Sequence, residues 1–229
     1  MFPIRDDAPH YTTPWVNYFI IVLNTLVFLL ELSLGPRHLD ALFFTLGMVP
    51  ANFTGALHAG AYAAGLVPIL TSMFIHAGWL HIIFNMWWLW IFGDNVEDSL
   101  GHFPYLIFYL LSGLGAAAVH IMFNLGSRVP SVGASGAIAG VMGAYFVLFP
   151  SARVLTFIFV FFTWLPAWLI LGYWFVLQFL SGASTSISPA SQTTGGVAFW
   201  AHVGGFVTGV VLIKLFPRRA PRYRFTAWQ

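Results

Sequence analysis

The stretch GASGAIAGVMGAYFVLF at 133–149 is 17 residues long and has no charged residue. At a rise of about 1.5 Å per residue, an α-helix of this length spans roughly 25 Å, less than the ~30 Å hydrocarbon core of a bilayer. Gly136, Gly140 and Gly143 fall on one helix face, and such a stripe of small residues lets a second helix approach closely. These features predict a short membrane helix buried among longer ones.

The rest of the chain has the composition of an integral membrane protein. Of its 229 residues, 59% are apolar and 7% are charged, whereas about a quarter are charged in soluble domains. So few charges cannot coat a soluble domain of this size, and the remaining surface must face lipid. This composition excludes a disordered chain and a soluble nucleic-acid-binding protein. The absence of cysteine excludes disulfides, thiolate metal sites and a cysteine nucleophile.

Including the central segment, the chain divides into six apolar stretches, each near the ~20 residues that a transmembrane helix needs. Turn-rich or charged residues separate them. The predicted spans are 15–33, 69–93, 103–124, 133–149, 154–180 and 196–216. The predicted fold class is therefore all-α, a polytopic membrane protein with a bundle of six transmembrane helices and a short, buried fourth helix.

The distribution of Lys and Arg predicts the orientation of the spans. With an even number of spans both termini share one side, and its basic residues are Arg5, Arg153, Lys214, Arg218, Arg219, Arg222 and Arg224. Only Arg37 and Arg128 lie on the other side. By the positive-inside rule both termini are cytoplasmic. Residues 1–14 then form a cytoplasmic N-terminal segment and 217–229 a basic cytoplasmic tail, on either side of a membrane domain over 15–216.

Polar side chains inside the spans mark a candidate site, because they are costly in a bilayer. Ser135 and His202 both lie near the outer ends of their spans. Gly205 and Gly209 share a helix face with His202 and form a second stripe of small residues. If the two stripes meet, Ser135 Oγ and His202 come within hydrogen-bonding distance. A serine beside a neutral histidine is an activated nucleophile.

Acyl transfer also needs hydrogen-bond donors for the developing oxyanion. His81 and Asn85, four residues apart on one helix face, are candidates, as is the backbone N–H of Ser135 at a helix N-terminus. His76 points elsewhere on an unbroken helix, although Gly78 could change the path of the chain. The outer halves of the fourth and sixth spans contain no Asp or Glu. The sequence therefore predicts a Ser–His dyad, and Glu31 at the end of the first span is expected to be interfacial.

The order and spacing of these motifs resemble those of rhomboid intramembrane serine proteases, in their minimal six-helix bacterial-type form. The motifs are HAGWLHIIFN at 76–85, GDNVEDSLG at 93–101, GASGAIAG at 133–140 and AHVGGFVTG at 201–209. The resemblance implies that Ser135 is the nucleophile and His202 its base, with His81, Asn85 and the Ser135 N–H as the oxyanion hole. The residues it implies to be structural around this machinery are His76, Gly133, Gly136, Gly205, Gly209 and Glu97.

The resemblance also implies a membrane-embedded first loop over 34–68 and a cap at 181–195 over a substrate entry path. Substrates would be single-pass transmembrane proteins, and the site would open to the extracytoplasmic side of a bacterial inner membrane. No cofactor, metal or nucleic acid is expected, and membrane lipid is the other partner. The sequence departs from the family where many members have a Trp-Arg pair, here Val67 and Pro68. Ala139 stands where some members stack an aromatic ring on the histidine.

Two other classes of protein remain open. A non-catalytic rhomboid-like protein that binds membrane clients would typically lack the serine or the histidine, and both are present. A channel or transporter that uses the histidines as a proton path would need polar residues through both membrane halves, yet the inner half is almost wholly apolar. A metalloprotease is disfavoured because H-E-x-x-H is absent, and paired intramembrane aspartates are absent as well.

Overall fold

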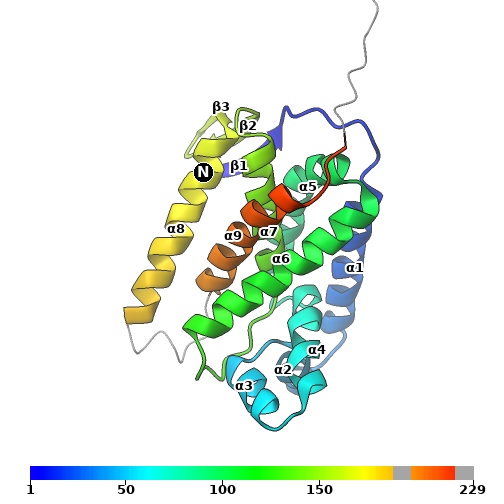
Figure 1. The fold of residues 1–229 in the computed structure, drawn as a ribbon, viewed down its shortest axis with the longest axis vertical. Helices are drawn as coiled ribbons and strands as arrows, with labels where there is room; N and C mark the ends of the chain where they lie inside the picture. Colours follow the sequence, from blue (N-terminus) through cyan, green and yellow to red (C-terminus); the bar gives the residue numbers. More distant parts are fainter. Residues whose placement is uncertain (188–196, 220–229) are drawn as a thin grey trace, which may run out of the picture.

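The computed structural model describes residues 1–187 and 197–219. Figure 1 shows long helices side by side, with short helices gathered at one end and the strands at the other. In chain order the elements are β1 Phe2–Asp6, α1 Trp15–Leu32, α2 Pro36–Leu46, α3 Pro50–His58, α4 Tyr62–Thr71, the 3₁₀ turn η1 Ser72–Phe74, α5 Trp79–Leu100, α6 His102–Phe123, α7 Ser135–Leu148, β2 Arg153–Ile158, β3 Phe161–Pro166, α8 Ala167–Ile187 and α9 Phe199–Leu215.

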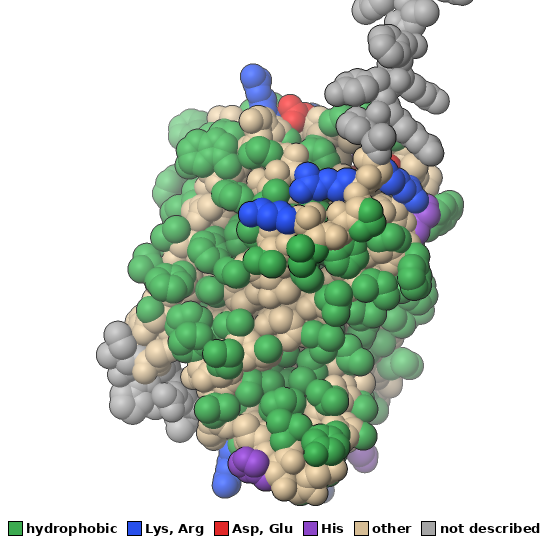
Figure 2. Space-filling model, viewed as in Figure 1, with side chains coloured by type: hydrophobic (Ala, Val, Ile, Leu, Met, Phe, Trp, Pro, Cys, Tyr) green, Lys and Arg blue, Asp and Glu red, His purple; other side chains and the backbone are tan. Residues whose placement is uncertain are grey.

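The long helices have the length and apolar character of membrane spans. Within the described residues, α1, α6 and α8 qualify on length and composition, and the bent pair formed by Tyr62–Phe74 and α5 adds a fourth. Helices α7 and α9 are apolar but shorter, at 14 and 17 residues. Apolar side chains cover most of the face in Figure 2, and Lys and Arg side chains gather near the strand end. The protein is therefore a mostly helical, polytopic membrane protein.

Helix α7 lies at the centre of the bundle and packs against α5, α6, α8 and α9. Every residue from Gly136 to Tyr145 is buried. A helix that is apolar on all sides is typical of a protein core or a membrane span, and the glycines of α7 let its neighbours come close. The short helix is therefore the core of the fold, and its first residue, Ser135, lies where the surrounding helices meet the loop before it.

The prediction of one helix over 154–180 is wrong. Residues 153–166 form the hairpin β2–β3, and β1 pairs antiparallel with β2, which brings Phe2 opposite Phe157 and Asp6 opposite Val154. Helix α8 begins at Ala167 and has 21 residues, enough to span a bilayer without the hairpin. Hydropathy alone could not distinguish the two, because strands and membrane helices are both rich in aromatic and β-branched residues.

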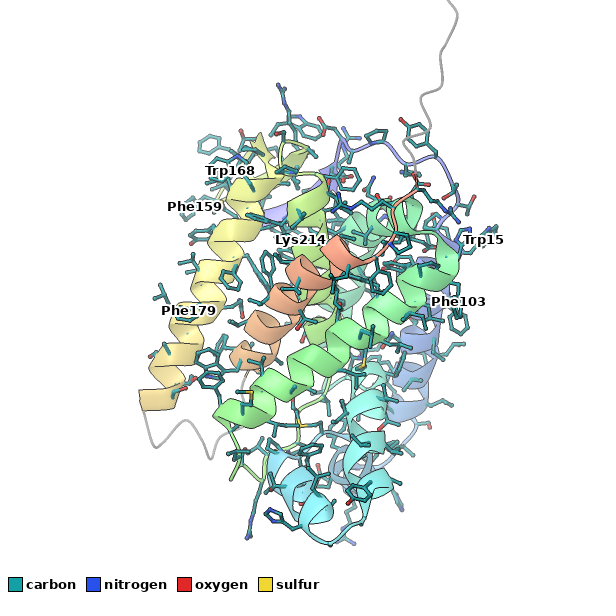
Figure 3. All side chains as sticks on the ribbon, in the orientation of Figure 1. Trp15, Phe103, Phe159, Trp168, Phe179 and Lys214 are labelled. Atoms are coloured by element: carbon teal, nitrogen blue, oxygen red, sulfur yellow. The ribbon has the colours of Figure 1, made fainter. Side chains whose placement is uncertain are left out.

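The hairpin has its own environment at one end of the molecule. Phe159 at its turn is 90% exposed, and Figure 3 shows Phe159 and Trp168 at the strand end, with Phe179 farther along α8. The Tyr145 hydroxyl of α7 donates a hydrogen bond to the Asp6 carboxylate of β1. Burial raises the pKa of Asp6, and the hydrogen bond from Tyr145 opposes that rise. The sheet therefore closes the end of α7 that lies opposite Ser135.

The predicted second span, 69–93, is also corrected. The chain breaks after η1, bends by 82° and restarts at Trp79, so that α5 continues to Leu100 through the GDNVEDSLG motif. Glu97 within that motif is fully buried, and its carboxylate accepts hydrogen bonds from the backbone N–H groups of Val16 and Asn17 at 3.0 and 2.7 Å. An acid at a helix N-terminus is stabilised by the helix dipole. Glu97 therefore fixes the start of α1 to the end of α5.

The segment between α1 and α5 contains α2, α3 and α4 and is held by backbone hydrogen bonds. Met48 and Ser131 exchange two of them, at 3.0 and 2.8 Å, and the Ala51 N–H donates to the Ser127 carbonyl at 3.0 Å. Thr71 Oγ1 donates to the Leu46 carbonyl within the same segment. These bonds fasten the first loop to the segment that precedes Ser135, so its attachment does not depend on a Trp-Arg pair.

Candidate active site

A cavity of about 830 Å³ lies between α5, α6, α7, α8 and α9 and the segment before α7. Its wall is largely apolar and also carries polar side chains, as in many ligand sites. The residues of its wall that matter for chemistry are Ser135, His202, His81, Asn85 and Trp174. The cavity therefore collects, from separate helices, most of the polar residues that the sequence singles out.

Ser135 and His202 are in direct contact. The hydroxyl Oγ of Ser135, the first residue of α7, lies 2.8 Å from Nε2 of His202 on α9. This is hydrogen-bonding distance. His202 is buried, with 9% of its surface exposed. The structure thus brings together the two residues that sequence spacing pairs.

The contact depends on glycines in both helices. A Cβ added at Gly205 would lie 1.9 Å from the carbonyl oxygen of Gly136, and one added at Gly209 would lie 1.9 Å from that of Gly140. No side-chain atom can occupy these positions, so α9 lies directly on the backbone of α7. The predicted meeting of the two glycine stripes is confirmed, and this packing places His202 beside Ser135.

His81 and Asn85 lie next to Gly133, two residues before Ser135. Gly133 has φ +119°, a left-handed conformation that favours glycine, and a Cβ there would lie 2.5 Å from His81 Nε2 and 3.7 Å from Asn85 Nδ2. The Ala77 N–H donates to His81 Nδ1 at 3.4 Å, which leaves Nε2 to carry the ring proton. Within the described residues the Asn85 Nδ2 group is buried without a partner. Both side chains therefore hold donors toward the serine.

His76 is expected to point away from His81 only on an unbroken helix, and the helix is broken at Gly78, the alternative that the sequence leaves open. Helix α5 begins only at Trp79, and the two imidazole rings meet edge to face at 5.1 Å between centroids. The backbone N–H of His76 faces the Glu31 carboxylate, with its nitrogen 3.2 Å from each oxygen. Glu31 is 2% exposed, so it is a buried partner of the turn before α5, at the end of α1.

Other expected residues lie apart from the site or outside the described residues. Glu97 is at the opposite end of α5, where it contacts the start of α1, so it does not support the site directly. Of the predicted cap at 181–195, residues 181–187 belong to α8 and the rest fall outside the described residues. Among residues 1–187 and 197–219, no group of three or more His, Cys, Asp or Glu could hold a metal ion.

Sequence reasoning missed Gln178 and Trp174 of α8. Gln178 Oε1 lies 2.7 Å from Nδ1 of His202, and the Trp174 ring lies 5.7 Å from the imidazole, centroid to centroid. Gln178 is the one amide side chain in α8, a signal of the same kind that singled out the histidines. The predicted span, 154–180, contains Gln178 near its outer end, but a neutral amide is a weaker sign of a site than an ionisable side chain.

Comparison with known families identifies the scaffold. Residues 63–219 match the Rhomboid domain family, and this range contains Ser135, His202 and the residues around them. The chain belongs to the rhomboid family. The resemblance read from the four sequence motifs is therefore confirmed.

Rhomboid relatives come from several kinds of organism. The chain is 30% identical over 154 residues to the mitochondrial Rhomboid protein 1 of Saccharomyces cerevisiae, covering 66% of this chain and 42% of the relative. It is 34% identical over 132 residues to Rhomboid protease GluP of Bacillus subtilis, covering 57% and 24%. It is 28% identical over 219 residues to Presenilin-associated rhomboid-like protein A, mitochondrial, of Danio rerio, covering 90% and 50%. The chain thus spans half or less of each of these relatives.

Proposed function

We propose that this rhomboid protein is an intramembrane serine endopeptidase that hydrolyses a peptide bond in or near the transmembrane segment of single-pass membrane proteins. The observation that carries the proposal is the 2.8 Å contact between Ser135 Oγ and His202 Nε2 at the wall of the cavity. A relative named Rhomboid protease, GluP, supports the same activity. The apolar wall suits a substrate that arrives from the bilayer.

The chemistry follows from the positions of the donors and acceptors. His202 Nε2 takes the proton of Ser135 as Oγ attacks the scissile carbonyl, and then gives it to the leaving amine. The negative oxygen of the tetrahedral intermediate faces His81 Nε2–H, the Asn85 amide and the Ser135 backbone N–H, which lies in the first helical turn and has no partner within the helix. Water then hydrolyses the acyl-enzyme with His202 again as base.

We also propose that α7 and α9 lie in the membrane with α1, α5, α6 and α8, which gives six spans with a short fourth one. Lys214 lies in the last turn of α9, at the end of the helix far from His202 (Figure 3), and Arg153 is the first residue of β2. By the positive-inside rule that end and both termini face the cytoplasm. The cavity then opens to the extracytoplasmic side, in a bacterial host the outer face of the inner membrane.

Because the chain has no cysteine, single cysteines can test this orientation. Gly126→Cys, in open space before α7, is expected to react in intact cells with a membrane-impermeant maleimide. Ser151→Cys, exposed at the strand end, is expected to react only after permeabilisation. Reaction of Ser151→Cys, and not Gly126→Cys, in intact cells would invert the proposed topology.

The proposed activity is tested with the purified protein in detergent or liposomes. A serine-directed fluorophosphonate is expected to label Ser135, and a single-pass transmembrane reporter is expected to yield two fragments whose cut lies in or near its membrane segment by mass spectrometry. A protein that neither labels nor cleaves, yet captures membrane proteins, would be a non-catalytic client-binding member of the family.

Removing one oxyanion donor is expected to slow cleavage without abolishing it. Asn85→Ala and His81→Ala leave the nucleophile and the base in place, and losses on the order of 10²- to 10³-fold in kcat are expected for each. Ile83→Ala is the matched control, because Ile83 lies on the same helix and is 48% exposed. Wild-type rates for both Asn85→Ala and His81→Ala would mean that other groups form the oxyanion hole.

A further inference from the structure

The second ring nitrogen of His202 also has a partner, and it comes from a third helix. Gln178 of α8 is half-buried, and its Oε1 lies 2.7 Å from His202 Nδ1, while Nε2 of the same ring contacts Ser135 at 2.8 Å. Gln178 does not line the cavity, whereas Ser135, His202 and Trp174 do. It therefore lies behind the histidine, where it can act on the ring without touching a substrate.

Trp174 precedes Gln178 by one helical turn and packs on the same imidazole, with the planes inclined at 34°. Residues four apart on a helix share one face, so α8 presents a ring contact and a hydrogen-bond acceptor to His202 together. Ala139, where some family members have an aromatic ring, cannot hold the histidine. Here α8 supplies that support.

The chemistry of imidazole decides what the contact with Gln178 does. A neutral ring has one N–H donor and one acceptor nitrogen. For His202 Nε2 to accept the Ser135 proton, Nδ1 must carry the ring proton and needs an acceptor. After the proton transfer both ring nitrogens are donors, and the Gln178 carbonyl then accepts a hydrogen bond from a cation. The opposite orientation of the amide would place two donors against each other at that moment.

We propose that Gln178 is the positioning residue of the dyad, holding His202 in the orientation and tautomer in which Nε2 serves as the base for Ser135. This rests on the proposed protease function. A neutral acceptor suits the membrane, where a carboxylate is costly, and the buried acid Glu31 is engaged with the backbone of His76. A hydrogen bond to a charged donor is about twice as strong as a neutral one, so the contact strengthens as the imidazolium forms.

The kinetic test compares variants that keep or lose the acceptor oxygen at position 178. Gln178→Met keeps the length of the side chain and removes the acceptor, and it is expected to lower kcat about 10- to 100-fold with KM little changed. Gln178→Glu keeps an acceptor oxygen and is expected to restore most of kcat. Leu177→Met is the matched control on the outward face of α8, where Leu177 is 41% exposed.

A spectroscopic readout does not depend on turnover. In ¹⁵N-histidine NMR spectra of the wild type, the signals that disappear in His202→Ala are expected to show a proton on Nδ1, and Gln178→Met is expected to shift that population toward Nε2–H. An unchanged tautomer and kcat in Gln178→Met, or equal losses in Gln178→Met and Gln178→Glu, would overturn the positioning role. Failure of the wild type to react with fluorophosphonate would overturn the protease function instead, and the tautomer measurement would still decide the role of Gln178.

Discussion

Purified Ser135→Ala and His202→Ala proteins are expected to show no measurable cleavage of a transmembrane reporter while remaining folded. Loss of the nucleophile or its base in serine proteases lowers kcat by about 10⁶-fold, because the two groups act as a unit. The Ser135 hydroxyl contacts His202, and the N-cap position of its helix belongs to Ala134. Its removal therefore takes away the attacking atom with little effect on packing.

Cleavage rate, fluorophosphonate labelling and melting temperature in detergent are to be measured on the same preparations. Ser112→Ala is the control, because Ser112 is fully buried on α6, adjoins Gly140 of α7 and has a hydroxyl without a partner among the described residues. This variant should cleave normally. Substantial turnover by purified Ser135→Ala or His202→Ala would exclude the dyad as the catalytic centre.

The pairing of Ser135 with His202 could be predicted from sequence because glycine spacing is a strong geometric constraint. Two helices that meet along glycines have few ways to pack, and counting residues from the stripe then places each polar side chain. His202 lies three residues before Gly205, and Ser135 immediately precedes Gly136. The bounds of α1, α6, α7 and α9 were also close to prediction, since each is a separate apolar run between turn-forming residues.

The parts that were missed depend on contacts between distant segments. The hairpin at 153–166 is as apolar as a membrane helix, and only its pairing with β1 reveals that it is a sheet. This error moved the start of the predicted fifth span toward the strand end, away from the observed start of α8 at Ala167. In the same way, the bend before Trp79 accompanies a contact between the His76 backbone N–H and the Glu31 carboxylate, 45 residues apart in the chain. Local periodicity carries no signal of either.

Adding a single methyl group at Gly205 is expected to inactivate the protein almost completely. The Cβ of Gly205→Ala would lie 1.9 Å from the Gly136 carbonyl oxygen, whereas real Cβ contacts are essentially never shorter than 3.0 Å. The backbone fixes the position of the Cβ, and the oxygen is itself a backbone atom. No side-chain rotation can therefore relieve the overlap, and α9 must move by about 1 Å. Misplacing a catalytic group by that distance can cost about 10²-fold in rate, and overpacking of this kind costs about 1–3 kcal/mol of stability.

A second substitution on α9 distinguishes helix packing from chemistry. Val207→Ile also adds one carbon to α9, but Val207 is 48% exposed and points away from α7, so activity and melting temperature should stay near those of the wild type. A wild-type rate in Gly205→Ala would contradict the α7–α9 packing that places His202 beside Ser135.

Gly209→Ala provides the closest comparison, because its Cβ would meet the Gly140 carbonyl oxygen at the same 1.9 Å. The two alanine variants should therefore lose similar melting temperature. Gly209 lies seven residues from His202 and Gly205 only three, so a displacement centred on Gly205 moves the imidazole more directly. We expect a clearly larger fall in kcat for Gly205→Ala than for Gly209→Ala at equal loss of stability. If the two rates fell in parallel with stability alone, α9 would act only as a support for the fold, and its approach to α7 would not set the geometry of the dyad.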